Sequence, residues 1–302
     1  MKLGQFESNM TDGEWAGAIY DGEVVHLQAA AAAAGIDLPE DIVTTTAEWG
    51  WRKKVDLAVI YAQETGAGLY DRTELTQRKP VTDPQKVVCV GLNYRDHADE
   101  GGFDAPEEPV LFSKFSQSLT GPNENIEWDP ELTSAVDYEG ELVIVMGDRA
   151  RNVDEEAALD YVAGYTIGND VSARDLQMAD EQWVRGKSLD TFGPIGPQIV
   201  TPDEISDVGD LDIWTEVNGD RLQESNTRQL IFDIKELVSF CSRAFTLEPG
   251  DLVFTGTPDG VGYFRDPQVL LDDGDTITVG IEGIGELENT CRHVQQSPSH
   301  CQ

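Results

Sequence analysis

The chain has 302 residues, of which 57 are Asp or Glu and 21 are Lys or Arg, giving a formal net charge of -36. This length is enough for one large domain or two smaller ones. A negative field of this size repels phosphates and anionic lipids, so we expect neither nucleic acid nor a membrane among the partners. No apolar run approaches the roughly 20 residues that span a bilayer, and no signal peptide is evident, so we expect a cytoplasmic protein.

The acidic residues are dispersed along the chain and lysines are few. Acidic surfaces of this kind are typical of halophilic archaeal proteins, because concentrated salt screens their self-repulsion. We therefore expect a halophilic archaeal source, with an ordinary acidic bacterial protein as the alternative. The four cysteines show no CxxC spacing, so neither a disulfide framework nor a zinc site is expected, and Cys89 and Cys241 are predicted to be core residues.

Residues 1–80 have the pattern of a small α+β domain. GAIYDGEVVHL predicts a short hairpin, and the Ala-rich segment after it predicts a helix that ends at Gly35. A second helix is predicted within AEWGWRKKVDLAVIYAQETG. The polar, proline-bounded RKPVTDPQK is the best candidate for a domain boundary.

Beyond this boundary, strands predominate and do not alternate regularly with helices. Strands are predicted at VVCVG, ELVIVM, AGYTIGND, LDIWTEV, DLVFTG and DTITVGIE, with Asn218-Gly219 in a hairpin turn. One long helix is predicted from Leu230 through Cys241 by apolar residues at helical spacing. The pattern excludes a doubly wound parallel sheet. Residues 291–302 are expected to form a flexible tail.

DYEGELVIVMG places Asp137, Glu139 and Glu141 at every second position, just before an apolar run. In a strand these three carboxylates would share one face at the mouth of a buried element. Asp170, at the end of the apolar strand in GYTIGND, offers a further carboxylate. Oxygen ligands without histidine or cysteine suit a hard cation such as Mg²⁺, Mn²⁺ or Ca²⁺. The alternative is a set of solvated acids in a very acidic chain.

Five motifs, taken together, resemble the fumarylacetoacetate hydrolase family. They are GLNYRDHADE, DYEGEL, GYTIGNDVSARDLQ, GKSLDTFGPIGP and FTGTPDGVG, and the resemblance covers residues 84–290. It implies an α+β fold: a mixed β-roll catalytic domain over 84–290, with residues 1–80 as a variable N-terminal domain. It also implies a Mg²⁺ or Mn²⁺ cofactor, a homodimer, and a small 2-oxo or β-diketo acid as substrate.

Carried over residue by residue, the resemblance makes Glu139, Glu141 and Asp170 the metal ligands, while Asp137 is not normally a ligand. His97 and Glu100 match an acid/base dyad, and their i, i+3 spacing would place both on one helical turn. The segment around them is expected to act as a mobile lid. A lone histidine in a polar stretch is otherwise a surface residue.

The remaining motif residues are expected to face the substrate. Lys187 matches a lysine that holds a developing oxyanion or balances the metal carboxylates. Without the motifs, Arg174 and Gln177 would be interpreted as a pair at the start of a surface helix, and the glycines around Thr257 as a plain turn. The expected substrate-binding residues are Tyr94, Lys114, Arg174, Gln177, Gly256 and Thr257.

The motifs favour an enzyme that hydrolyses, decarboxylates or isomerises its substrate through a metal-stabilised enolate. DYEGEL and GKSLDTFGPIGP are most similar to the acylpyruvase and hydroxymuconate or heptadienedioate isomerase branches. A dehydratase of 2-keto-3-deoxy sugar acids is the alternative enzyme. A metal-dependent 2-oxo acid binding protein without catalysis is the alternative of another class.

Overall fold

The computed structural model describes residues 1–9, 11, 13–102 and 104–295. The fold is α+β, as predicted, and strands predominate. The strands are β1 (Lys2–Glu7), β2 (Trp15–Tyr20), β3 (Glu23–His26), β4 (Leu69–Asp71), β5 (Thr76–Arg78), β6 (Val87–Gly91), β7 (Val110–Lys114), β8 (Leu119–Thr120), β9 (Asn125–Trp128), β10 (Val136–Asp137), β11 (Gly140–Met146), β12 (Val162–Asn169), β13 (Ser172–Ala173), β14 (Gly193–Val200), β15 (Asp212–Val217), β16 (Asp220–Asn226), β17 (Leu252–Phe254), β18 (Thr276–Ile281) and β19 (Gly285–His293). The α-helices are α1 (Leu27–Ala34), α2 (Ile42–Thr46), α3 (Trp51–Thr65), α4 (Arg95–Gly101), α5 (Arg174–Ala179), α6 (Val184–Lys187) and α7 (Ile234–Ala244).

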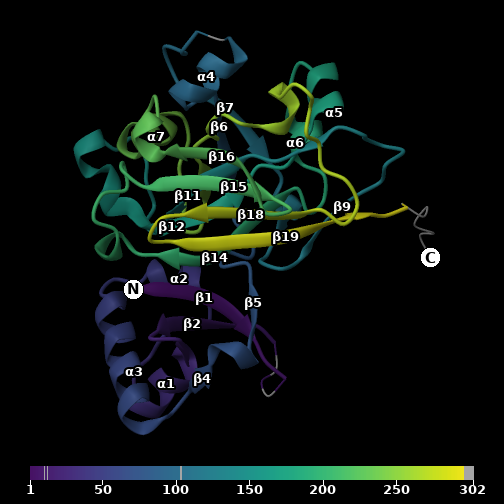
Figure 1. Ribbon diagram of the computed structural model, residues 1–302. Coiled ribbons are helices and arrows are strands. Elements are labelled where there is room, and N and C mark those ends of the chain that lie inside the picture. Colours follow the sequence, from purple (N-terminus) through teal and green to yellow (C-terminus); the bar gives the residue numbers. More distant parts are fainter. Residues whose placement is uncertain (10, 12, 103, 296–302) are drawn as a thin grey trace, which may run out of the picture.

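Two mixed sheets form the body of the molecule (Figure 1). The larger has the order β4-β3-β2-β1-β14-β12-β11-β17-β6-β7, with β5 beside β1 and β8 beside β14. The second has the order β16-β15-β18-β19-β9. Most neighbouring strands are antiparallel, but β6 with β17, β8 with β14 and β9 with β19 run parallel. The expected mixed β-roll is confirmed. Helix α4 lies at one end of the molecule, and α1 and α3 lie at the opposite end.

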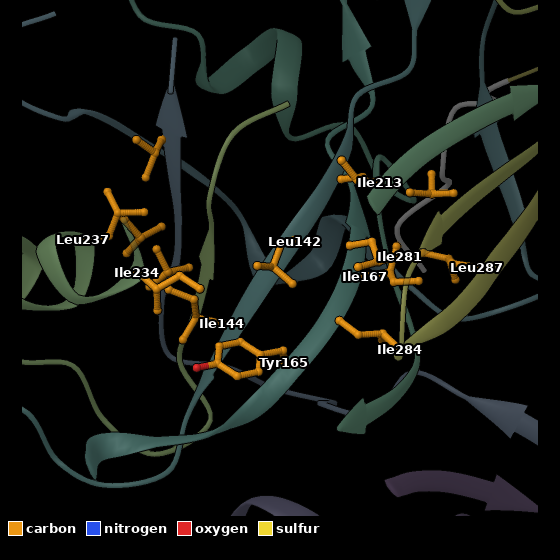
Figure 2. Packing of buried hydrophobic residues seen from close by; sticks show 14 of the residues in the cluster. Leu142, Ile144, Tyr165, Ile167, Ile213, Ile234, Leu237, Ile281, Ile284 and Leu287 are labelled. Carbon is orange, nitrogen blue, oxygen red and sulfur yellow. The ribbon is translucent and has the colours of Figure 1, made fainter. Parts of the chain in front are cut away.

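β11 lies at the centre of the core, which explains its uninterrupted apolar sequence. Alternate residues of a strand point to opposite faces. Leu142 and Ile144 therefore join the larger core, beside α7 and the second sheet, as Figure 2 shows. Val143 and Val145 join the other core, on the opposite face of the sheet. A strand covered on both faces holds its ends rigidly. Glu139 lies directly before this strand and Glu141 at its beginning.

The N-terminal region contains the predicted hairpin, as β2 and β3, and the predicted helix that ends at Gly35, as α1. The second predicted helix is α3, which begins at Trp51. These elements are continuous with the rest of the molecule, because β1 pairs with β14. Residues of α1 and α3 also belong to the same apolar core as β14 and one face of β11. The N-terminal region therefore extends the central sheet.

Two boundaries differ from those predicted. The long helix was predicted from Leu230, but α7 begins at Ile234 because Asp233 and Glu236 form a capping box there. At the C-terminus β19 continues to His293, so the segment expected to be a tail from residue 291 begins inside a paired strand. Residues 296–302 lie outside the described part of the chain.

Cys89 and Cys241 are buried, as predicted for core residues, and Cys291 is a third buried free thiol. Cys301 lies outside the described residues. Within the described ranges, every helix is too short or too polar to cross a lipid bilayer.

Candidate active site

Three buried carboxylates meet at one edge of the central sheet. Ligand oxygens of Glu139, Glu141 and Asp170 lie within 4.8 Å of one another. The pairing of β11 with β12 explains this arrangement, because the two strands are antiparallel and Gly140 lies opposite Asn169. The start of one strand and the end of the other therefore lie at the same edge. All three side chains are less than 10% exposed.

Asp137 does not join this group. The strand is interrupted after β10, so the expected single face carrying three alternate carboxylates does not exist. The Asp137 carboxylate instead accepts hydrogen bonds from the backbone N–H groups of Tyr138, Gly262 and Tyr263. It also pairs with Arg174 at 2.7 Å. Asp137 therefore fixes the arginine and the neighbouring loop.

Three buried cations surround the carboxylates. Lys187 Nζ lies 2.9 Å from both Glu139 Oε2 and Asp170 Oδ2. Lys114 Nζ lies 2.6 Å from Asp170 Oδ1, so this residue, expected to shape the substrate cavity, serves as a counter-charge. Arg174 Nη1 lies 2.7 Å from Glu139 Oε1. Each ion pair is largely removed from water, where an unpaired charge would be very unfavourable.

Four buried carboxylates, counting Asp137, face three cations, so one negative charge is in excess. Burial opposes ionisation of Glu139, but Lys187 and Arg174 outweigh it and lower its pKa. Burial raises the pKa of Glu141 well above its ordinary value, and the charges of Asp170 and Glu139 raise it further. Burial lowers the pKa of Lys187, but Asp170 and Glu139 reverse the effect and keep it protonated. The excess is therefore relieved at Glu141, whose carboxyl retains a proton in the absence of a cation.

The residues fit a hard divalent cation. The donor set is entirely carboxylate oxygen, which suits Mg²⁺ or Mn²⁺ better than zinc. Glu141 Oε2 accepts a hydrogen bond from Gly256 N at 2.7 Å, which orients the carboxylate. A bound cation would supply the missing positive charge and allow Glu141 to ionise.

A cavity of about 210 Å³ opens onto this group. Glu139, Glu141, Arg174, Gln177 and Lys187 line its polar side. Most of the rest of its lining is apolar, and apart from Leu92 none of these apolar residues belongs to a sequence motif. They are Val90, Leu92, Phe112, Met178, Trp183 and Phe264.

The predicted acid/base pair lies on α4, beside this cavity. His97 lines the cavity, and its Nδ1 is 3.5 Å from Glu100 Oε2, as the i, i+3 spacing predicted for one helical turn. This distance is longer than a good hydrogen bond, and among the described residues the buried His97 Nδ1 has no hydrogen-bond partner. Both carboxylate oxygens of Glu100 accept from Gly260 N, at 3.1 and 3.2 Å. Asp96 on the same helix accepts a hydrogen bond from Ser225.

Of the other expected substrate contacts, Gln177 and Thr257 line the cavity, whereas Tyr94 and Gly256 do not. The Thr257 hydroxyl donates to Gly140 O at 3.0 Å and accepts from Gln223 at 2.9 Å. Its proton is therefore engaged within the protein. The Tyr94 hydroxyl is fully buried without a partner, and burial raises its pKa.

Gly256 meets a requirement that only glycine satisfies. Its φ of +99° is strained for other residues, and an added Cβ would lie 2.9 Å from Asn93 Cβ. This conformation presents Gly256 N to Glu141. Gln223, which no motif indicated, is hydrogen-bonded to the same loop. The sequence contained only a weak indication of Gln223, as a polar residue at an inward-facing position of a hairpin strand.

The family model described as fumarylacetoacetate (FAA) hydrolase C-terminal matches residues 86–292. A mitochondrial oxaloacetate tautomerase of Xenopus laevis is 44% identical over 230 residues, which is 76% of this chain and 72% of the relative. The fumarylacetoacetate hydrolase domain-containing protein 2 homolog of Dictyostelium discoideum is 47% identical over 225 residues, 71% of this chain and 73% of its own.

Solved structures resemble the whole chain. The fumarylacetoacetate hydrolase of the psychrophile Exiguobacterium antarcticum is 36% identical with a TM-score of 0.80, covering 97% of this chain and 100% of that one. The 5-carboxymethyl-2-hydroxymuconate delta-isomerase of Mycobacterium smegmatis is 35% identical with a TM-score of 0.76, covering 98% and 100%. The alignments therefore include the N-terminal elements.

Proposed function

This chain belongs to the fumarylacetoacetate hydrolase family, and we propose that it catalyses the keto–enol isomerisation of a small 2-oxo acid with the help of Mg²⁺ or Mn²⁺. The observation that carries the proposal is one cavity lined by Glu139, Glu141 and His97. Asp170 completes the carboxylate group beside it, and Glu100 is the partner of His97. Relatives named as oxaloacetate tautomerases make oxaloacetate the first substrate to test.

Glu139, Glu141 and Asp170 would hold the cation, which would supply Lewis-acid stabilisation of the substrate oxygens. His97 would remove a proton from the carbon next to the keto group and, as the imidazolium, return a proton to the keto oxygen, so that the enol forms with no net gain or loss of protons. Glu100, 3.5 Å from His97 Nδ1, would orient the imidazole. Lys187 would add positive charge beside the oxygen that becomes negative.

Hydrolysis of a C–C bond is the second candidate, supported by the fumarylacetoacetate hydrolase of Exiguobacterium antarcticum, which aligns with the whole chain. In that reaction His97 would instead activate a water molecule. Dehydration of a sugar acid is disfavoured, because Phe112, Met178 and Trp183 offer few hydrogen bonds to a polyol. A non-catalytic binding protein would have no use for the histidine–glutamate pair.

A panel of 2-oxo acids tests the reaction: oxaloacetate, acylpyruvates, hydroxymuconates and 2-keto-3-deoxy sugar acids, each with Mg²⁺ or Mn²⁺ in molar KCl. Tautomerisation is expected to be the fastest reaction, and it is measured as the loss of the enol's absorbance. Calorimetry tests the cation site, because Glu141→Ala should abolish Mn²⁺ uptake. Activity that survives complete removal of divalent cations would overturn the proposal.

The homodimer implied by the resemblance is proposed as well. β7 is an edge strand of the large sheet; Val110, its first residue, is 40% exposed, and Phe115, directly after it, is 58% exposed. Apolar side chains at a sheet edge are favourable sites for association with a second copy. Sedimentation of the protein in molar KCl should give the mass of two chains, and a monomer would refute this assembly.

A further inference from the structure

We propose that Gln223 is a positioning residue that fastens the loop of residues 255–260 to the carboxylate-bearing start of β11. Its side chain lies on β16 and is 1% exposed. Its Oε1 accepts hydrogen bonds from Gly140 N at 3.0 Å and Thr215 Oγ1 at 2.8 Å. Its Nε2 donates to Thr257 Oγ1 at 2.9 Å and Pro258 O at 3.0 Å. One neutral amide thus joins two segments far apart in the sequence.

The loop that Gln223 holds touches both halves of the candidate active site. Near its beginning, Gly256 N donates to Glu141 at 2.7 Å. At its end, Gly260 N donates to both oxygens of Glu100. The Gln223 bonds fall between these two contacts. A shift of the loop would therefore move a candidate cation ligand and the partner of His97 together.

The other side of the amide fixes β11 at Gly140, the residue between Glu139 and Glu141. Gly140 N donates to Gln223, and Gly140 O accepts from the Thr257 hydroxyl, which itself accepts from Gln223. These bonds close a ring. Glutamine suits this position because its amide provides donors and acceptors without adding a charge to a group already one negative charge in excess.

The effect of Gln223 on the candidate active site rests on the proposed function, whereas its effect on the loop of residues 255–260 does not. Gln223→Met preserves length and removes the hydrogen bonds. In the metal-free protein, amide exchange of a peptide covering residues 255–262 should accelerate at least tenfold, equivalent to about 1.4 kcal/mol. Mn²⁺ affinity measured by calorimetry should fall about 10–100-fold, as is typical when the groups orienting metal ligands are removed.

Gln198→Met is the matched control. Gln198 on β14 is also buried, at 4% exposure, and donates to Ile284 O, outside the candidate active site. Gln223→Met should lose more melting temperature than Gln198→Met, because it removes more hydrogen bonds, and only Gln223→Met should change loop exchange and Mn²⁺ affinity. Thr215→Val removes one partner of Gln223 Oε1 and should cause a smaller increase in loop exchange and a smaller loss of Mn²⁺ affinity. If Gln223→Met does not fold, Thr215→Val tests the proposal in its place.

Loop exchange and Mn²⁺ affinity equal to those of Gln198→Met would overturn the proposal and leave Gln223 as a satisfied core amide. If the unmodified protein binds no Mn²⁺ at all, the proposed function fails, and the exchange measurement alone then decides the role of Gln223.

Discussion

Replacing Glu141 by glutamine is expected to stabilise the metal-free protein at neutral pH while abolishing cation binding. The change keeps an oxygen that can accept from Gly256 N. It is neutral without a bound proton, whereas Glu141 must either hold a proton or ionise beside the other carboxylates. Two carboxylates within 4.8 Å of each other repel by about 3.5 kcal/mol at an effective dielectric constant of about 20. Lys187 and local relaxation offset part of this repulsion, so we expect a gain of about 2 kcal/mol in the free energy of unfolding.

The sign of the pH dependence follows from the raised pKa of Glu141, whose largest cause is burial. The folded protein retains a proton that the unfolded chain releases above about pH 4.3, so this residue lowers stability as pH rises above that value. The advantage of Glu141→Gln should therefore be largest at pH 7–8 and disappear towards pH 4. Denaturant unfolding in molar KCl with a chelator measures it.

Glu131→Gln is the matched control, because it removes one exposed carboxylate and so makes the same change in net charge. It should change stability by less than about 0.5 kcal/mol. At 100 times its Kd, Mn²⁺ should stabilise the unmodified protein by about 2.7 kcal/mol and leave Glu141→Gln unaffected. A Glu141→Gln protein that is less stable than Glu131→Gln at pH 7–8 would refute the excess-charge reasoning.

Three further outcomes are expected. His97→Ala should lower turnover about 10²–10⁴-fold with nearly unchanged Mn²⁺ affinity, and intact turnover would show that the base lies elsewhere. The melting temperature should rise steeply with KCl, because the Debye length falls from about 30 Å at 0.01 M to about 3 Å at 1 M; a flat series would refute the halophilic interpretation. Gly140→Ala should lower the melting temperature in thermal scans, because its Cβ would lie 2.9 Å from Val279 Cγ1, and an unchanged value would show that the strand yields.

The features that the sequence predicted well depend on neighbours within a few residues. The apolar run of β11 identified a buried strand, and Asn218-Gly219 identified the hairpin turn between β15 and β16. The His97–Glu100 contact followed from helical spacing. The grouping of Glu139 and Glu141 with Asp170 was expected from motif resemblance, and the antiparallel pairing of β11 with β12 supplies its physical reason.

The tertiary structure alone decided which charges face one another. Asp137 follows the same alternation as Glu139, yet it accepts hydrogen bonds from the backbone of Tyr138, Gly262 and Tyr263 and does not join the three carboxylates. Lys114 was expected at the cavity wall and instead pairs with Asp170. Gln223 carried no motif, because its partners are contributed by β11, β15 and a loop distant in sequence. Local periodicity fixes the face on which a side chain lies, but buried charges and amides find partners across the fold, and those partners depend on which strands become neighbours.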